Sequence, residues 1–445
     1  MNPAKTGLSR RQVLQSGAVA AGALAFSASP FPIVKAQDPQ RLGVAVIGAG
    51  GMGGYSVDES LKENLVALVD VDENIIAKVM NDKVKDQARP KVFYDYRKML
   101  EECHKEIDVV LIATPDHHHA PAAIRAIDLG KHVFAQKPLA HNIYECYALA
   151  RAAKEKKVHT QMGNQGYCGE TIRRVAEYIA SGAIGAVTET HTILGRNFGG
   201  SGGRPSSKPV PTGLHWDEWL GPAPAREYHD GLHTFSWRNW RQFGTGTIGD
   251  MACHHVAFPF MALRLWEAKK FTIECVNTAH GSEEQYPQDN VVCYHVPARE
   301  GIPAVKCFVY DHAALKPEIM LETEKKEGRK FGEFTLFVGT KGMIGSDGQT
   351  IPKELEVGKI EQTLPRAHGG PIADLYHCIR NGGTPASNFV DAAASLTSIA
   401  LTGHLAQFAG KGSKIDWDVE KMASTNNADV NRFVKREYRQ GWEVV

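Results

Sequence analysis

One glycine-rich turn limits the fold of this chain more than any other feature. Residues 41–47 (RLGVAVI) are an apolar run typical of a strand buried on both faces, and they lead directly into GAGGMGG. The residues up to about Lys62 then favour a helix, and residues 65–70 favour a second strand. This order predicts a βαβ unit, in which parallel strands lie beside a helix that begins at the glycines.

The spacing of the glycines indicates a nucleotide site. Gly48, Gly50 and Gly53 form the pattern GxGxxG, and Gly51 and Met52 lie between the last two. Glycines in this context let the backbone approach a pyrophosphate at the N-terminus of a helix, where N–H groups and the helix dipole favour anions. A turn that serves only tight packing is the alternative explanation.

Asp70 favours the nucleotide explanation. It ends the second strand, 17 residues beyond Gly53, where a carboxylate accepts hydrogen bonds from the ribose hydroxyls of a dinucleotide. A 2′-phosphate would be repelled at this position, and no arginine follows immediately. The sequence therefore favours NAD over NADP as the cofactor.

The alternation of strands and helices continues through the first third of the chain. Strand-like runs at 107–113 and 132–135 alternate with helical stretches at 121–129 and 142–156. Such alternation is typical of an α/β fold with a doubly wound parallel sheet. We therefore expect a Rossmann domain over residues 37–160.

Beyond residue 160 the pattern changes to longer strands, which predict a large and mostly antiparallel open sheet in a second, C-terminal α/β domain over residues 161–445. The strand-like runs are 271–278, 290–296, 304–311 and 334–338. Two amphipathic stretches, near 372–380 and 392–406, are expected to pack on that sheet or to return to the first domain.

The first 36 residues differ from the rest of the chain. Residues 9–15 (SRRQVLQ) precede a small-residue apolar run at 16–28, and small residues at 34–36 suit a cleavage site. This pattern resembles a twin-arginine export signal. We therefore expect residues 1–36 to be a removable signal peptide and the mature chain, from about Gln37, to be exported to the periplasm. A disordered basic tail is the alternative.

Charge and hydropathy exclude several classes of function. The formal charge of the whole chain is +1. The leader contains four basic residues and no acidic one, so the mature chain would have a charge of about −3. This charge does not favour binding to nucleic acid. The leader's apolar run is too short for the ~30 Å hydrocarbon core of a bilayer, and no other stretch reaches about 18 apolar residues, so membrane insertion is not expected. The eight cysteines form no CxxC pair, so neither a zinc site nor a disulfide framework is predicted.

Several polar residues follow the strand at 107–113 and so lie at the carboxyl edge of the sheet. Thr114 and Pro115 come first, and three adjacent histidines, 117–119, follow. Neighbours in a loop rarely converge on one ion, and no matching carboxylate or cysteine cluster accompanies them, so no metal site is predicted. Thr114, Pro115 and His119 are instead candidates for contact with the cofactor.

The segment GKHVFAQKPLA, at 130–140, supplies the main catalytic candidate. Lys137 follows the strand at 132–135, and the carboxyl end of a later parallel strand is where the nicotinamide end of a dinucleotide must lie. A lysine at that place can hydrogen-bond the hydroxyl that is oxidised. We therefore predict that Lys137 is catalytic and that Gln136 and Lys137 contact the cofactor. An exposed surface lysine is the alternative.

The second domain contains a further candidate pair in GTGTIGDMACHH, at 244–255. If the segment after the glycines is helical, Asp250 and His254 are i, i+4 neighbours on one face, and the carboxylate can orient the imidazole as a proton acceptor. A helix-capping aspartate beside a buried histidine is the alternative.

In their order and spacing, GAGGMGG, Asp70, TPDHHHAP, GKHVFAQKPLA and GTGTIGDMACHH resemble the Gfo/Idh/MocA oxidoreductases, the family of glucose-fructose oxidoreductase and inositol dehydrogenase. The resemblance covers nearly all of the mature chain. Three further stretches, QMGNQGYCGETIRRV, HWDEWLGPAP and REYRQGWEVV, resemble the exported subgroup of that family.

The resemblance implies a Rossmann domain, a C-terminal substrate-binding domain whose open sheet mediates homodimers or homotetramers, and hydride transfer between NAD(P) and a sugar or polyol hydroxyl. By motif, Lys137 is the lysine of the family's EKP segment, Pro138 is the proline often found in cis, and Asp250 and His254 are the DxxxH acid–base pair. Two positions depart from the pattern. Gln136 replaces the Glu of EKP, which removes a negative charge beside Lys137, and Ala257 stands where relatives often place Asp.

Aromatic and polar residues of the second domain are candidates for substrate contact, because carbohydrates stack on Trp and hydrogen-bond Arg. We expect these contacts from His191, Arg196, Trp237, Arg238 and His255. The leading hypothesis is an oxidoreductase that acts on a ring hydroxyl of a sugar, polyol or glycoside.

An exported enzyme meets little free nucleotide, which is compatible with a tightly bound NAD that is recycled within each catalytic cycle. A second hypothesis is therefore a glycoside hydrolase or lyase that transiently oxidises C3, so that the C2 proton becomes acidic and the anomeric group is eliminated without net redox change. A non-catalytic sugar or nucleotide binder is a third hypothesis, which the combination of Lys137, Asp250 and His254 disfavours.

Overall fold

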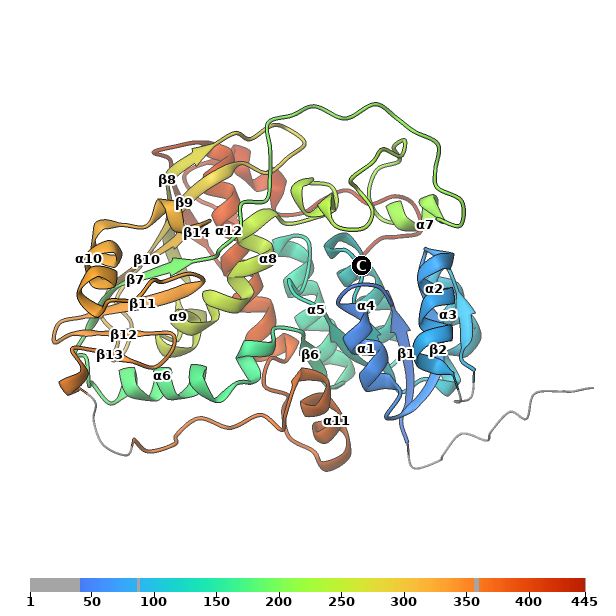
Figure 1. The fold of residues 1–445 in the computed structure, drawn as a ribbon, viewed down its shortest axis with the longest axis horizontal. Coiled ribbons are helices and arrows are strands. Elements are labelled where there is room, and N and C mark those ends of the chain that lie inside the picture. Colours follow the sequence, from blue (N-terminus) through green and yellow to red (C-terminus); the bar gives the residue numbers. More distant parts are fainter. Residues whose placement is uncertain (1–40, 86–88, 356–359, 445) are drawn as a thin grey trace, which may run out of the picture. The chain divides into compact units, whose positions relative to one another are not determined.

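The computed structural model describes residues 41–85, 89–355 and 360–444; the predicted signal peptide lies outside these residues. The described chain builds two sheets, each with its own helices (Figure 1). The first sheet has six parallel strands in the order β3-β2-β1-β4-β5-β6. Its strands are β1 (Gly43–Ile47), β2 (Asn64–Val69), β3 (Lys91–Phe93), β4 (Val109–Ile112), β5 (His132–Ala135) and β6 (Thr160–Met162).

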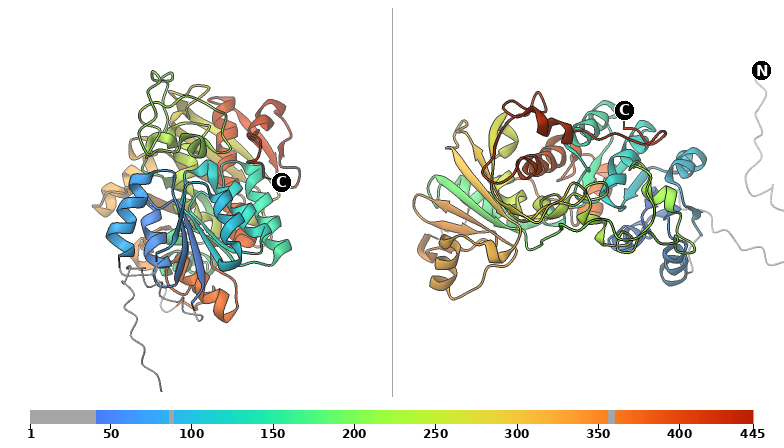
Figure 2. Two further views of the ribbon diagram at one scale, coloured as in Figure 1. Left: turned by 90° about the vertical axis from the view of Figure 1, so that its right-hand side faces the viewer. Right: turned by 90° about the horizontal axis from the view of Figure 1, so that it is seen from above.

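Helices between these strands cover the sheet, as the left view of Figure 2 shows. They are α1 (Gly53–Ser60), α2 (Glu73–Val79), α3 (Tyr96–Cys103), α4 (His119–Asp128) and α5 (Ile143–Lys156). Three begin with a side-chain cap, in which Asp72, Asp95 or Asn142 accepts a hydrogen bond from a backbone N–H of the first turn. The central strands β1 and β4 are buried along their whole length, as expected of a parallel sheet covered on both faces.

The second sheet has nine strands in the order β13-β12-β11-β7-β10-β9-β8-β14-β15. All its neighbouring strands pair antiparallel except β7 and β10, which are parallel. The strands are β7 (Val187–Ile193), β8 (Lys270–Ala279), β9 (Gln288–Val296), β10 (Val305–Tyr310), β11 (Phe334–Gly339), β12 (Met343–Gly345), β13 (Thr350–Ile351), β14 (Lys414–Asp418) and β15 (Ala423–Ser424). The predicted fold class, a Rossmann domain followed by an α/β domain with a mostly antiparallel sheet, is confirmed.

Seven α-helices lie in the described part of the chain after β6: α6 (Glu170–Ala180), α7 (Trp216–Leu220), α8 (Gly246–His255), α9 (Ala257–Ala262), α10 (Glu318–Glu327), α11 (Pro371–Asn381) and α12 (Ala394–Ala409). Helix α12 contacts α8 and β8 and also α5 of the first domain, whereas α11 contacts α1 and β6. The C-terminal part of the chain therefore returns to the Rossmann domain.

The predicted boundary between the domains, at residue 160, falls within the last strand of the first sheet. Strand β6 ends at Met162, so the first sheet extends two residues past the predicted boundary at residue 160.

Among the described residues, the segment Phe389–Ala409 is long and apolar enough to cross a membrane by composition, but most of it is buried inside the protein. It contains α12, which contacts α5 of the first domain as well as α8 and β8 of the second.

Candidate active site

The glycine turn joins β1 to α1 as predicted, and its geometry requires glycine. Gly48 has φ +83° and Gly51 has φ +52°, in the left-handed region that side chains rarely adopt. A Cβ on Gly53 would lie 2.1 Å from the carbonyl oxygen of Gly48. The backbone at the N-terminus of α1 is thus left open to a ligand, and this is where oriented N–H groups bind the phosphates of a nucleotide.

Asp70 lies at the carboxyl end of β2, directly against the glycine turn. Its Oδ2 accepts the N–H of Ala49 at 2.8 Å and the N–H of Gly50 at 3.3 Å, and its Oδ1 accepts the N–H of Asp72 at 3.1 Å. A carboxylate offers about four acceptor positions, so one remains for a ribose hydroxyl. Asp70 therefore shapes the phosphate-binding turn in addition to its predicted contact with ribose.

A cavity of about 730 Å³ runs from this turn to Lys137. Its walls include the hydroxyl of Thr114 and the amide of Gln136, and none of these polar atoms has a hydrogen-bond partner within the described chain although each is buried. Buried polar groups without partners are costly and normally await a ligand or water. The open glycine turn, Asp70 and these orphaned atoms fit a bound NAD. The lining also includes Gly48, Gly50, Gly51, Met52, Pro115, Trp237 and Arg238 from the predicted set.

Lys137 follows β5 at the carboxyl edge of the first sheet. The peptide bond between Lys137 and Pro138 is cis, as predicted. Its Nζ donates to Oδ1 of Asp250 at 2.9 Å, and the two side chains are 13% and 8% exposed. Arg238 Nε donates to the same Oδ1 at 3.3 Å. Burial alone would raise the pKa of Asp250, but the two cations together lower it. Asp250 is therefore an ionised anchor for Lys137.

His254 is on the same helix as Asp250, as predicted, because α8 spans both residues. The expected pairing differs, however: in the described chain no hydrogen bond joins Asp250 to His254, and the carboxylate is shared by Lys137 and Arg238. Burial, reinforced by the charge of Lys137, lowers the pKa of His254 to about 3. The imidazole is thus neutral at physiological pH.

The three adjacent histidines are buried and contact backbone carbonyl groups, and of the three only His118 lines the cavity. His117 and His118 each place Nε2 2.9 Å from the carbonyl oxygen of Trp219. His119 has Nδ1 2.7 Å from the Pro138 carbonyl oxygen and Nε2 2.9 Å from that of Thr114. His119 therefore does not line the cavity; it ties the turn after β4 to the segment that carries Lys137.

Three of the predicted substrate residues lie outside the cavity lining. The ring of His191 stacks on Phe308 within the second sheet, at 5.2 Å between centroids. Arg196 and His255 both contact Glu333, at 2.6 Å and 3.7 Å. Each contacts a partner in the C-terminal domain, and none of the three belongs to the cavity lining. Gly53 also lies outside the lining, because it packs against Gly48.

The cavity contains residues that the sequence did not single out. Asp116, directly after Pro115, lines it beside Lys137. Trp442, near the C-terminus, lines it as well, with its ring 3.7 Å from the guanidinium carbon of Arg97. The position of Asp116 after a buried strand was a signal available in the sequence, and Trp442 lies in REYRQGWEVV, a stretch that was noted only as a resemblance and given no role.

Residues 213–238, here called the strap, close one side of the cavity. The strap leaves the C-terminal domain and contacts the turn after β2: His215 Nε2 lies 2.9 Å from Glu73 Oε1, and His233 Nε2 lies 3.0 Å from Asp72 Oδ2. Backbone bonds reinforce this contact, since the His215 N–H donates to Val71. The turn after β2 is where the adenosine ribose is expected, so the strap covers that end of the nucleotide.

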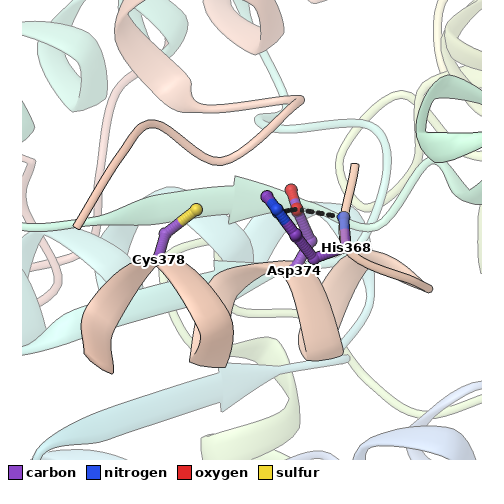
Figure 3. A group of neighbouring side chains, drawn as sticks. All are labelled: His368, Asp374 and Cys378. Carbon is purple, nitrogen blue, oxygen red and sulfur yellow. Dashed lines mark hydrogen bonds and ion pairs between the residues drawn. The ribbon is translucent and has the colours of Figure 1, made fainter. Parts of the chain in front are cut away.

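Among the described residues, one group of possible metal ligands lies outside the cavity, at the start of α11. Ligand atoms of His368, Asp374 and Cys378 lie within 4.8 Å of one another, and Figure 3 shows the contact between His368 and Asp374. The Asp374 carboxylate already accepts backbone N–H groups of His368 at 2.7 Å and of Ala386 at 2.8 Å. We assign Asp374 to the anchoring of these two loops.

Two family profiles match the chain. The first, "Oxidoreductase family, NAD-binding Rossmann fold", covers residues 42–164. The second, "Oxidoreductase family, C-terminal alpha/beta domain", covers residues 170–279. Together they cover just over half of the chain.

Curated relatives match over shorter stretches. "Glycosyl hydrolase family 109 protein 1" of Shewanella sp. (strain ANA-3) is 29% identical over 201 residues, which are 40% of this chain and 43% of that protein. The levoglucosan dehydrogenase of Pseudarthrobacter phenanthrenivorans (strain DSM 18606 / JCM 16027 / LMG 23796 / Sphe3) is 28% identical over 161 residues, 36% of this chain and 33% of that protein. The chain thus matches less than half the length of either relative.

Among solved structures, the WlbA dehydrogenase from Bordetella pertussis, in complex with NADH and UDP-GlcNAcA, has a TM-score of 0.55 to this chain at 15% identity. The match covers 85% of this chain and 99% of that one. At this level of identity the similarity supports the fold, and the fold agrees in both domains.

Proposed function

Because the chain belongs to the Gfo/Idh/MocA oxidoreductase family and has its NAD-binding Rossmann fold, we propose that it transfers a hydride between NAD and a ring hydroxyl of a sugar, polyol or glycoside. The observation that carries this proposal is Lys137, which lines the far end of the cavity that begins at the glycine turn and is held there by the buried carboxylate of Asp250; Asp250 and His254 themselves lie outside the lining. A nucleotide held at the turn reaches the lysine only with its nicotinamide end.

Along the cavity, different residues bind the different parts of the cofactor and the substrate. The glycine turn and Asp70 hold the pyrophosphate and ribose, and the Thr114 hydroxyl and Gln136 amide meet the nicotinamide end. Bound in this way, NAD supplies the hydride acceptor. Lys137, held by Asp250, donates a hydrogen bond to the substrate hydroxyl and so fixes the orientation of its carbon.

Two side chains of the strap support a carbohydrate substrate. Trp237 lines the cavity, and the guanidinium carbon of Arg238 lies 4.2 Å from its ring centroid. An aromatic face beside a guanidinium suits a sugar ring, which offers a C–H face and hydroxyl groups. Both residues were predicted as substrate contacts, and their place in the lining supports that role.

The second candidate function, a glycoside hydrolase or lyase with retained NAD, is favoured by the similarity to the Shewanella glycosyl hydrolase family 109 protein. In this reaction the C3 hydroxyl is oxidised to a ketone, the C2 proton is removed, and the bond to the aglycone breaks as a C1–C2 double bond forms. For net hydrolysis, water then adds at C1 and a solvent proton at C2, and return of the hydride to C3 restores the original redox state. The strap supports retention of the cofactor because it covers the adenosine end of the cavity.

One experiment separates the two functions. Purified protein is incubated in deuterated solvent with glucose, inositol and a panel of 4-nitrophenyl glycosides, and NADH absorbance and product mass are followed together. Accumulation of NADH with an oxidised sugar supports the dehydrogenase. Release of 4-nitrophenol with deuterium at C2 and no NADH supports the hydrolase. Absence of both signals across the panel contradicts the proposed function.

Retention of NAD by the strap gives a separate prediction. His233→Ala removes the contact with Asp72, in which both side chains are only 16% exposed, and should speed NAD release roughly three- to tenfold, as expected for a partly buried contact of about 1 kcal/mol. Release is measured by stopped-flow displacement of bound NADH. His280→Ala is the control, because its side chain is 63% exposed and its carboxylate partner is Asp289 of the second sheet. Equal release rates in the two variants would show that the strap does not hold the nucleotide.

A further inference from the structure

Arg238 brings a second cation to the reaction end of the cavity. It is the last residue of the strap, it lines the cavity, and its side chain is 17% exposed. Its Nε donates to Oδ1 of Asp250 at 3.3 Å, and Nζ of Lys137 donates to the same oxygen at 2.9 Å. Because one oxygen accepts both bonds, a single sugar ring can contact the guanidinium and the ammonium at once.

The guanidinium of Arg238 is fixed in place by its neighbours. Its carbon lies 4.2 Å from the ring centroid of Trp237 and 4.6 Å from that of Phe235, and both are cation–π contacts. Its Nη1 also donates to the carbonyl oxygen of Phe235 at 3.2 Å. The backbone is closely packed as well, since a Cβ on Gly244 would lie 2.5 Å from the Cα of Arg238. The group is therefore oriented before any ligand binds.

One edge of this guanidinium is available to a ligand. A guanidinium has five N–H groups, and the bonds to Asp250 and Phe235 use one on Nε and one on Nη1. Nη2 has no hydrogen-bond partner among the residues that the structure describes. Two neighbouring N–H groups of a guanidinium match the two oxygens of a carboxylate. The free edge of Arg238 therefore suits a planar anion.

The charges at this end of the cavity leave one cation without a counter-charge. Although burial opposes it, Lys137 and Arg238 together lower the pKa of Asp250, which is ionised and lies between them. Burial and the charge of Asp250 raise the pKa of Asp116, so that this neighbouring carboxyl is largely protonated at pH 6. Burial keeps the imidazole of His254 neutral, because it lowers the pKa to about 3. These groups sum to a charge of +1.

The other carboxylates of the lining do not compensate that charge. They are Asp70, Asp82, Asp95 and Glu218. The three aspartates follow β2 or β3, whereas Lys137 follows β5. Strands β1 and β4 lie between β2 and β5, and at about 4.8 Å per strand this separates them by about 14 Å. Glu218 belongs to α7, in the part of the strap that contacts the turn after β2.

We propose that Arg238 binds a carboxylate on the same sugar ring that is oxidised, so that the preferred substrate is a uronic acid or its glycoside. The inference rests on the proposed function and names the substrate class of that same site. Lys137 donates to the hydroxyl that is oxidised, and the free edge of Arg238 binds the two carboxylate oxygens. One carboxylate balances the charge of the site, whereas a phosphate monoester, at about −1.5 to −2, would exceed it.

Matched pairs of sugars test this proposal at pH 6. Each pair is a hexose and the uronic acid of the same configuration: glucose with glucuronate, galactose with galacturonate, and mannose with mannuronate, both free and as 4-nitrophenyl glycosides. Glucose 6-sulfate and glucose 6-phosphate are included as tetrahedral anions. NADH absorbance and 4-nitrophenol release are followed for every compound. In the best pair, kcat/KM for the acid should exceed that for the hexose by roughly 10- to 10²-fold, as expected for hydrogen bonds to a charged group.

Two variants of Arg238 separate recognition of the carboxylate from support of the site. Arg238→Gln removes the charge and should abolish the preference for the acid, whatever its effect on the hexose. Arg238→Lys keeps the charge without the planar fork, so part of the preference should remain. The control is Arg241→Gln. Arg241 lies outside the cavity lining, with its guanidinium carbon 3.9 Å from the ring centroid of Phe408, and its loss should change the preference by less than about threefold, because solvent screens a distant charge.

Binding without turnover gives a second readout. Calorimetry on protein saturated with NADH measures the Kd of glucuronate, galacturonate and the matching hexoses in complexes that cannot be oxidised, because the cofactor is already reduced. The acid should bind the wild-type protein at least roughly tenfold more tightly than the hexose, and Arg238→Gln should remove this difference. A purely structural role of Arg238 would weaken the binding of acid and hexose equally.

Three results would overturn the inference and leave the proposed function intact. They are equal or better turnover of the hexoses, a preference for the sulfate or phosphate ester over the uronic acids, and a preference for the acid that survives in Arg238→Gln. Lack of turnover of every compound would instead contradict the proposed function, and the carboxylate assignment would fall with it.

Discussion

Lys137→Met is expected to lower kcat/KM by at least ~10³-fold, because it removes the amine that hydrogen-bonds and orients the substrate oxygen. The loss should appear in kcat, since the glycine turn and Asp70, which hold the nucleotide, are unchanged. Steady-state kinetics on a panel substrate, with NAD binding measured by calorimetry on the same preparation, checks both statements.

The control for this variant is Lys154→Met. Lys154 is an exposed lysine on α5, so its loss removes the same functional group without touching the cavity. Asp250 keeps Arg238 as a partner in the Lys137 variant, which is why we expect the folded protein to survive. A Lys137→Met protein that keeps more than a tenth of the wild-type kcat/KM would contradict the proposed function.

Asp311→Asn is expected to stabilise the protein at alkaline pH by up to about 5 kcal/mol, the linkage value of a pKa difference of about four units. Asp311 is 1% exposed, its Oδ2 accepts the N–H of Asn290 at 3.0 Å, and its Oδ1 has no partner in the described chain. Burial raises its pKa to about 8. In the unfolded chain the Asp311 carboxyl ionises near pH 4, whereas in the folded protein it stays protonated until about pH 8. The stability that the protonated carboxyl contributes is therefore complete below pH 4 and is lost as the pH rises towards 8.

Urea unfolding at several pH values between 4 and 9 tests this expectation. The wild-type protein should lose stability across that range more steeply than the Asp311→Asn variant. Asp230→Asn serves as the control, since that carboxylate is 65% exposed. If the Asp311→Asn variant and the wild-type protein show the same pH slope, the carboxyl is not protonated in the folded state.

Local patterns in the sequence were sufficient for much of the site. The glycine turn, Asp70 and Lys137 each stand beside a strand that is apolar along its length, so both the strand and its carboxyl end can be read from a few residues. The spacing of Asp250 and His254 predicted i, i+4 neighbours on the condition that the segment after the glycines is helical, and α8 spans both residues.

Partners that come from distant parts of the chain could not be predicted in this way. Asp250 was expected to orient His254, but Lys137, 113 residues away, competes for the carboxylate and, as a cation, has the stronger attraction. Strand β7, with the sequence VTETHTI, has five consecutive polar residues, a pattern typical of an exposed segment. It is nevertheless central, because β10 and β11 pair with it on either side. The predicted substrate role of His191 depended on a cavity that β7 does not reach.

The position of Trp442 has a consequence for biosynthesis. Its side chain, 2% exposed, lines the same cavity as Gly48, although almost the whole chain separates the two residues. During translation the Rossmann strands emerge long before this tryptophan, so a half-made protein presents a nucleotide site with one wall missing. The cavity wall is therefore complete only once Trp442 has been made, and a Trp442→Ala protein should release bound NAD on dialysis faster than the wild-type protein.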